Sequence, residues 1–203
     1  MLKASFSELI PEAGCDEAGR GCPAGPVYAA AVILHPEKPV EGLNDSKKLS
    51  EKKRLELRKE IEQKALAWAV ASIDNKEIDK INILNASILA MHRALEKLKT
   101  EPAFIITDGN RFKPFGKIPY QCIIKGDGKY QSIAAASILA KTHRDEFMLG
   151  LHKAYPNYGW NRNKGYATRE HRNAIGEYGL TPYHRLSFLK FYNQLEIKFK
   201  HNG

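Results

Sequence analysis

The chain has 203 residues, of which 43% are hydrophobic and 27% charged, a composition that fits one domain with a sizeable core. Its formal net charge of +9 favours an anionic partner such as nucleic acid, and the lack of an apolar run of about 18 residues excludes a transmembrane helix. The N-terminus has no secretory pattern, and the three cysteines form neither a C-x-x-C pair nor an even disulfide set. We therefore expect a cytoplasmic protein.

The first predicted strands carry a pair of acids. The apolar run 27–34 is rich in small and β-branched residues and predicts a buried strand. Asp16 and Glu17 precede it and are expected on or beside the same sheet. Because neighbouring strand residues point to opposite faces, at most one of these two acids can aim its side chain straight into a site.

A glycine–arginine–glycine turn follows these acids. Gly19 and Gly21 have no Cβ and allow the main chain to come very close to a ligand. Arg20 between them supplies a charge-assisted donor suited to phosphate. The stretch therefore predicts a hard-cation site beside a phosphate-contacting turn, with an ordinary acidic turn as the alternative.

Two helices are predicted in the middle of the chain. Ser50 is a plausible N-cap for a charged helix to about residue 64, and residues 65–73 return to a strand-like pattern. Between residues 81 and 98 apolar residues step by three and four, which predicts a helix with one core-facing stripe that ends before Pro102. The chain shows no other exposed apolar heptad, so we expect a monomer.

Two further acids lie where predicted strands end. Residues 104–107 form a short apolar run that leads directly into Asp108, a position where α/β sheets commonly keep their chemistry. Residues 118–124 predict another strand, followed by a lysine–glycine turn that contains Asp127 and by a helix from about Gln131.

The last fifty residues change character. Aromatic and basic residues alternate over 155–169, Thr168 caps a predicted helix that ends near Gly179, and residues 184–188 begin a final amphipathic segment. The aromatic rings favour either packing or stacking on bases and sugars. We therefore predict an α/β domain over residues 1–150 and a helical C-terminal extension, 151–203, packed on the same domain.

The acids Asp16, Glu17, Asp108 and Asp127 predict a metal site. Clustered carboxylates repel one another unless cations compensate, and Mg²⁺ and Mn²⁺ prefer such oxygen ligands. Two ions about 4 Å apart can clamp the attacking water and the leaving oxygen of a phosphodiester. The chain has no Cys/His cluster typical of zinc and no nucleophile elbow, so metal-assisted phosphodiester hydrolysis is favoured.

Each element alone has a simpler interpretation. Asp108 is typical of a turn, and Asp127 can pair with a neighbouring lysine on the surface. Lys47 lies in a stretch typical of a solvated loop, and Tyr166 is a packing residue unless it faces a groove. The histidines at positions 143, 171 and 184 are expected to be structural, hydrogen-bonded residues.

The combination of motifs is more specific than any one of them. These motifs are Asp16-Glu17-Ala18-Gly19-Arg20-Gly21, Ala24-Gly25-Pro26-Val27, Asp45-Ser46-Lys47-Lys48-Leu49, Thr107-Asp108-Gly109, Lys125-Gly126-Asp127, the run 132–141 with Arg144-Asp145, Lys164-Gly165-Tyr166, His171 and His184-Arg185-Leu186-Ser187-Phe188. In this order, over roughly residues 11–190, they resemble the ribonuclease HII family. The resemblance implies a ribonuclease H-like mixed sheet flanked by helices, with a helical C-terminal region. It implies cleavage of RNA within RNA/DNA hybrids and at single ribonucleotides in duplex DNA, giving a 3′-hydroxyl and a 5′-phosphate.

The same resemblance implies roles for individual residues. Asp16, Glu17, Asp108 and Asp127 would be the catalytic acids that bind Mn²⁺ or Mg²⁺, with Asp16 bridging two ions. The turn Gly19-Arg20-Gly21 would read the ribose 2′-hydroxyl, and Tyr166 would stack on the sugar of the following deoxynucleotide. Salt-sensitive backbone contacts are expected from Lys47, Lys48, Lys125, Lys129 and Lys164.

Two alternatives remain open on the sequence. One is a related metal nuclease that needs a run of ribonucleotides, and the other is a basic nucleic-acid-binding protein without catalytic activity. No clamp-binding tail is recognisable after residue 190, so recruitment to a replication clamp is not expected.

Overall fold

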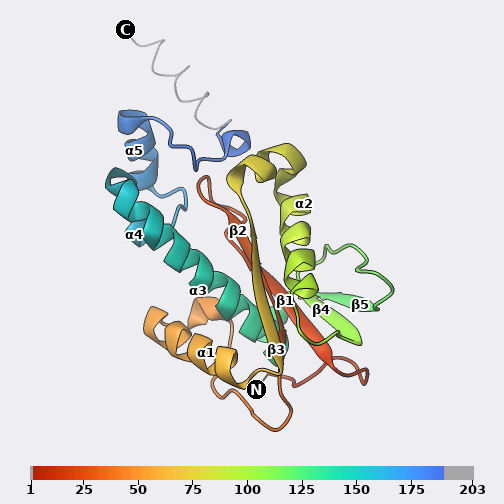
Figure 1. The fold of residues 1–203 in the computed structure, drawn as a ribbon. Coiled ribbons are helices and arrows are strands. Elements are labelled where there is room, and N and C mark those ends of the chain that lie inside the picture. The colour runs from red at the N-terminus through yellow and green to blue at the C-terminus, as the bar shows by residue number, and fades with distance from the viewer. Residues whose placement is uncertain (1, 190–203) are drawn as a thin grey trace.

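The computed structural model describes residues 2–189 (Figure 1). The prediction about a clamp-binding tail and most of the final amphipathic segment lie outside the described residues. Within the described part of the chain, none of the helices combines the length and the apolar character that crossing a membrane requires.

The core of the fold is a mixed five-stranded sheet in the order β3-β2-β1-β4-β5. The strands are β1 (Glu12–Ala18), β2 (Val27–Ile33), β3 (Ala67–Ile73), β4 (Phe104–Asp108) and β5 (Tyr120–Ile123). The first three are joined in antiparallel fashion, whereas β4 and β5 run parallel to β1. The prediction of an α/β fold with a mixed sheet is therefore confirmed.

Helices cover both faces of this sheet (Figure 1). The helices are α1 (Glu51–Lys64), α2 (Asn75–Glu96), α3 (Gln131–Ala154), α4 (Trp160–Asn163) and α5 (Arg169–Tyr178), with short 3₁₀ turns η1 (Ser46–Lys48), η2 (Gly126–Gly128), η3 (Pro156–Tyr158) and η4 (Leu186–Phe188). One face packs against α2 and the other against α1 and α3. The small helices α4 and α5 follow at the C-terminal end of α3. Because α3 runs unbroken across residue 150, it belongs to both predicted units.

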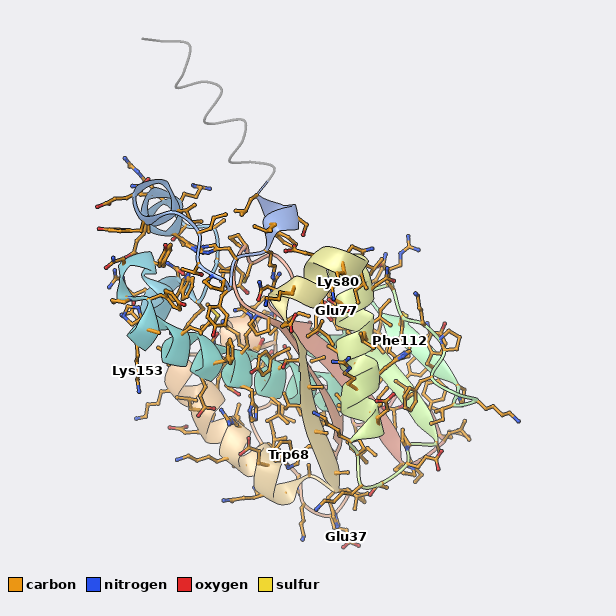
Figure 2. The ribbon with its side chains drawn as sticks, turned by 45° about the horizontal axis from the view of Figure 1, so that its top comes forward. Glu37, Trp68, Glu77, Lys80, Phe112 and Lys153 are labelled. Atoms are coloured by element: carbon orange, nitrogen blue, oxygen red, sulfur yellow. The ribbon has the colours of Figure 1, made fainter. Side chains whose placement is uncertain are left out.

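Strand alternation decides which side chains meet α3. On β1, Ala13 and Cys15 pack in the core on the α2 face, so Gly14 and Asp16 point to the α3 face. On β3, Trp68 packs on the α1 side (Figure 2), where its indole nitrogen donates to the Glu62 carbonyl at 3.0 Å. The acid of β1 therefore faces the layer that α1 and α3 form.

Helix starts were predicted well where a cap was visible. The side chains of Ser50 and Thr168 cap α1 and α5 by accepting backbone N–H groups. Helix α2 begins before the predicted apolar stripe of residues 81–98, because a polar first segment is capped by Asp74 and extends the helix to Asn75. This segment meets the apolar part at a kink at Asn82, where φ is 64°.

The predicted strand 118–124 is shorter in the structure. Its pairing in the sheet begins at Tyr120, directly after Pro119, which has no N–H to donate to a ladder. Of the C-terminal aromatic residues, Trp160 and Tyr158 are buried in a cluster with α5. For these two rings the packing alternative is therefore the correct one.

Candidate active site

Three aspartates that are distant in the sequence meet at one end of the sheet. Asp16, Asp108 and Asp127, here called the acidic triad, each offer a carboxylate oxygen, and these oxygens lie within 4.8 Å of one another. Strands β1 and β4 are parallel neighbours in which Cys15 pairs with Thr107. The next residue on each strand is an acid, so the register alone places Asp16 and Asp108 side by side on the α3 face.

The turn η2 brings the third acid to this pair. The Gly126 N–H donates to Asp108 Oδ1 at 2.7 Å, which fastens η2 to the end of β4. Asp127 is only 4% exposed, and its Oδ2 has no hydrogen-bond partner among the described residues. The nearest cation is the exposed Lys47, whose Nζ lies 3.6 Å from that oxygen.

Electrostatic repulsion and burial disfavour the charged forms of the acidic triad. Burial, followed by the charges of Glu17 and Asp108, raises the pKa of Asp16 well above its usual value. Burial, followed by Asp108, also raises the pKa of Asp127. One buried oxygen of this triad has no hydrogen-bond donor within the part of the chain that the structure describes, and all the ligand atoms on offer are carboxylate oxygens. Such a set suits a hard divalent cation such as Mg²⁺ or Mn²⁺ and does not suit zinc.

The fourth predicted acid is placed differently. Glu17 is not a member of the acidic triad. Its Oε1 accepts a hydrogen bond from Arg20 Nη1 at 3.1 Å. The pKa of Glu17 is raised above its usual value, because burial outweighs the opposing effect of the Arg20 guanidinium. This arrangement follows the strand alternation, which lets Asp16 point into the α3 layer and leaves Glu17 beside it.

A cleft of about 250 Å³ joins these acids to the other predicted site residues. Its lining consists of Asp16, Glu17, Ala18, Gly19, Arg20, Gly21, Ser46, Lys47, Arg54, Asp108, Ser137, Lys141 and Tyr166. Tyr166 is 42% exposed, and its ring lies across the cleft wall with Lys141 Nζ 5.6 Å from the ring centroid. The predicted acids, the turn Gly19–Gly21, Lys47 and Tyr166 therefore share one cleft, with Asp127 reaching it through the acidic triad. The other four predicted lysines, at positions 48, 125, 129 and 164, do not line it.

Five lining residues had no predicted role, namely Ala18, Ser46, Arg54, Ser137 and Lys141. Ser137 and Lys141 lie one turn apart on α3, and this helical spacing was a signal for a shared face. Ser137 Oγ lies 2.9 Å from Ser46 Oγ, which ties η1 to α3. Arg54 donates to the Ser46 carbonyl at 2.9 Å, but nothing in the sequence distinguishes it from the other charges of α1.

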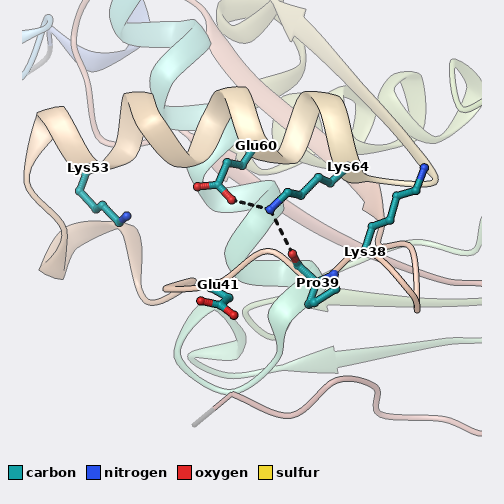
Figure 3. A pocket seen from close by; sticks show the side chains of 6 residues that line it. All are labelled: Lys38, Pro39, Glu41, Lys53, Glu60 and Lys64. Carbon is teal, nitrogen blue, oxygen red and sulfur yellow. Dashed lines mark hydrogen bonds and ion pairs between the residues drawn. The ribbon is translucent and has the colours of Figure 1, made fainter.

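A second hollow lies away from the acidic triad, between α1 and the loop after β2 (Figure 3). Lys64 donates there to Glu60 at 2.9 Å and to the Pro39 carbonyl at 3.4 Å. Lys53 is ion-paired with Glu56. Lys64 and Glu60 therefore pair within the hollow, whereas the partner of Lys53 lies outside its lining.

Tyr166 is held from behind by a buried histidine pair. His171 Nδ1 lies 2.9 Å from the Tyr166 carbonyl, while His171 Nε2 receives the Trp160 indole N–H at 3.1 Å and lies 3.2 Å from His184 Nε2. The Thr181 N–H donates to His184 Nδ1 at 2.9 Å. Since indole and amide N–H groups only donate, these contacts assign both rings as neutral. Both histidines are structural, as the sequence predicted.

Acidification is expected to weaken the fold through His184. Burial, followed by the neighbouring His171, lowers the pKa of His184 from 6.5 to about 4. Between these values the unfolded chain binds a proton that the folded protein does not bind. The contribution of the neutral ring to the free energy of unfolding is therefore complete above pH 6.5. It decreases as the pH falls toward 4, by up to about 3 kcal/mol.

The carboxyls of Asp16 and Asp127 have the opposite effect on the pH dependence of stability. Their pKa values are raised in the folded state, so acidification increases their contribution to the free energy of unfolding. A comparison of the parent with His184→Gln cancels these shared contributions. In thermal unfolding, the stability advantage of the parent over the variant should be smaller at about pH 4.5 than at about pH 7. An advantage that is equal at both values would contradict a neutral buried ring.

Comparisons with known proteins agree with this geometry. The family model for ribonuclease HII matches residues 13–191. A ribonuclease HII of Christiangramia forsetii is 62% identical over 194 residues, covering 96% of this chain and 98% of the relative. One from Bacteroides fragilis is 61% identical over 188 residues, covering 93% and 94%. The crystal structure of the ribonuclease H2 from Pyrococcus horikoshii superposes with a TM-score of 0.77 at 26% identity, covering 94% of this chain and 99% of that chain.

The matches extend over nearly the whole chain and include both the sheet that carries the acids and the C-terminal segment that carries Tyr166. A fold, an acidic cleft and a close sequence relationship thus lead to the same assignment. The chain belongs to the ribonuclease HII family and is a ribonuclease H, an endonuclease that hydrolyses phosphodiester bonds.

Proposed function

We propose that the protein cleaves the RNA strand of RNA/DNA hybrids and also incises 5′ of single ribonucleotides embedded in duplex DNA. The products would carry a 3′-hydroxyl and a 5′-phosphate. The observation that carries the proposal is a single cleft in which Asp16 and Asp108 lie with the turn Gly19–Gly21 and Tyr166. An enzyme that chooses where RNA meets DNA needs these two functions, cleavage and sugar recognition, in one place.

The acids supply the cleaving half of the proposal. Asp16, Asp108 and Asp127 would hold the divalent ion or ions, and we assign Glu17 to the same catalytic set from its place beside them. When bound, Mg²⁺ or Mn²⁺ supplies Lewis-acid stabilisation of the charge that develops on the phosphodiester. Asp16 and Asp127 are buried and Asp108 is half-buried, and reduced contact with water strengthens electrostatic interactions at such groups.

The turn and Tyr166 supply the recognising half. A 2′-hydroxyl is the group by which a protein distinguishes RNA from DNA. At Gly21 a Cβ would meet nothing within 4 Å, so the main chain there borders open space in which a sugar can lie. Tyr166 presents a partly exposed ring to the same cleft, and such rings stack well on nucleotides. Lys47 would contact the sugar–phosphate backbone of the substrate.

We also propose a monomer as the active form. The cysteines at positions 15, 22 and 122 are free, which fits a reducing compartment such as the cytoplasm. Which of the two ions serves in the cell is a property of the site together with ion availability, and we propose either Mg²⁺ or Mn²⁺.

A duplex DNA that carries one ribonucleotide and an end label tests the proposal. With Mg²⁺ or Mn²⁺ we expect one nick, 5′ of the ribonucleotide, whose 3′-hydroxyl a DNA polymerase can extend. A chelator should abolish the nick, because the acidic triad then has no cation to hold.

A continuous RNA/DNA hybrid serves as the control substrate in the same assay. Cleavage of the hybrid without the single-ribonucleotide nick would instead identify a nuclease that needs a run of ribonucleotides. Duplex binding that is indifferent to divalent metal, with neither substrate cut, would indicate a binding protein and contradict the proposed chemistry.

A further inference from the structure

Two arginine side chains are fully buried against the turn Gly19–Gly21 without a carboxylate partner. Arg144 on α3 and Arg185 just before η4 are each 0% exposed. Over residues 2–189 neither forms an ion pair. Burial of a guanidinium without a counter-charge is costly unless hydrogen bonds replace the lost water. Because both side chains donate to main-chain carbonyls, they are placed to hold the backbone.

Arg144 joins two segments that are far apart in the sequence. Its Nε donates to the Pro26 carbonyl at 3.0 Å and its Nη2 to the Ala24 carbonyl at 3.2 Å. Its Nη1 donates to the Lys164 carbonyl at 2.9 Å, two residues before Tyr166. The guanidinium carbon also lies 5.8 Å from the centroid of the Tyr166 ring. One planar group therefore connects the loop after the turn with the segment that presents the tyrosine.

Arg185 holds the turn itself. Its Nε donates to the Gly25 carbonyl at 2.9 Å and its Nη1 to the Arg20 carbonyl at 3.0 Å. Gly19 has a φ of +94°, and a Cβ there would overlap the Arg144 side chain. The main chain of the turn thus lies directly on the guanidinium of Arg144, and no side chain larger than hydrogen fits between them.

We infer that Arg144 is a positioning residue that sets the spacing between the turn Gly19–Gly21 and Tyr166, and thereby the preference for an RNA–DNA junction. The inference rests on the proposed function, in which the turn reads the ribose and Tyr166 the next sugar. A lysine would keep the charge, but its single ammonium cannot reproduce the rigid planar fork that reaches three carbonyls. The shape of Arg144, more than its charge, determines the spacing.

Arg144→Lys tests this role. On a duplex with one ribonucleotide we expect kcat/KM to fall by about 30-fold, with less than about a threefold loss on a continuous RNA/DNA hybrid. The hybrid is spared because it presents no junction for the turn and Tyr166 to span. Calorimetric Mn²⁺ binding without substrate should equal that of the parent, since the hydrogen bonds of Arg144 go to carbonyls outside the acidic triad.

Arg58→Lys is the matched control. Arg58 lies on α1 in ion pairs with Glu62 and Glu146, so both substrates should be cut as by the parent. If Arg144→Lys does not fold, as judged by circular dichroism, Arg185→Lys carries the test, because it loosens the turn from the other side.

The inference is overturned if the ratio of the kcat/KM values on the two substrates stays at the parental value, whether or not both fall, or if neither arginine variant folds. Each of those results is what a purely structural role would produce. Failure of the proposed function is seen separately in the parent enzyme, which would then leave the single-ribonucleotide duplex intact. The inference falls with it in that case.

Discussion

Replacement of Asp16 or Asp108 by asparagine is expected to lower the rate of cleavage by about 1,000-fold or more, the equivalent of about 4 kcal/mol of transition-state stabilisation. Each variant keeps the shape of the side chain but removes one of the charges proposed to bind the divalent ion. Binding of the uncut duplex should persist, because loss of a negative charge reduces repulsion of the phosphates. Single-turnover cleavage and a binding titration in chelator measure the two effects.

Asp16→Asn should also change stability in a direction that identifies the cause. In chelator the variant is expected to melt at a higher temperature than the parent, because burial and the neighbouring acids disfavour the charge of Asp16. Mn²⁺ should raise the melting temperature of the parent more than that of the variant. Glu41→Gln, which removes an exposed acid outside the cleft, is the control and should behave like the parent. Full activity in Asp16→Asn would refute the catalytic assignment.

Gly14→Ala is expected to destabilise the fold by about 3 kcal/mol or more, which for a chain of this size lowers the melting temperature by about 10 °C. Gly14 lies on the α3 face of β1, and a Cβ there would overlap the backbone of Ser132 and Ile133 in the first turn of α3. Main chain cannot move aside as a flexible side chain can, so the helix would have to lift from the strand. Thermal unfolding followed by circular dichroism measures the loss.

Gly150→Ala, in the helix that Gly14 contacts, is the matched control and is not expected to destabilise the fold. Gly150 lies in α3, and a Cβ added there would meet nothing within 4 Å. Alanine favours the helix over glycine by about 1 kcal/mol, so this variant should be as stable as the parent or slightly more stable. A Gly14→Ala protein with the parental melting temperature would contradict the close contact between β1 and α3.

Much of the fold could be predicted because local patterns and tertiary packing agree. Apolar runs marked β2, β3 and β4, and capping side chains marked the starts of α1 and α5. Asp108 was recognised as an acid at a strand end, and that position is where the structure has it. The kink at Asn82 was not predicted, because a positive φ at a non-glycine residue leaves no periodic signal in the sequence.

The parts that could not be predicted depend on neighbours in space. No local pattern states that β4 lies beside β1, so the meeting of Asp16 with Asp108 follows only from the sheet order. Arg144 and Arg185 were recognised only as parts of the family motifs. Nothing in the sequence marks them as the buried members of a set of 32 basic residues, because their burial depends on the loop after β1 that packs on them. The family resemblance supplied the grouping of the acids that periodicity alone left open.

The helix α3 fixes the relative positions of the sheet, the cleft and the turn Gly19–Gly21. Its first turn touches β1 at Gly14, its middle presents Ser137 and Lys141 to the cleft, and a later turn places Arg144 against the turn Gly19–Gly21. One residue inserted between positions 137 and 144 would rotate everything beyond it by about 100° and shift it by about 1.5 Å. Length changes should therefore be tolerated in the surface loops of this family and eliminated in that stretch, so that cleavage and recognition stay in phase.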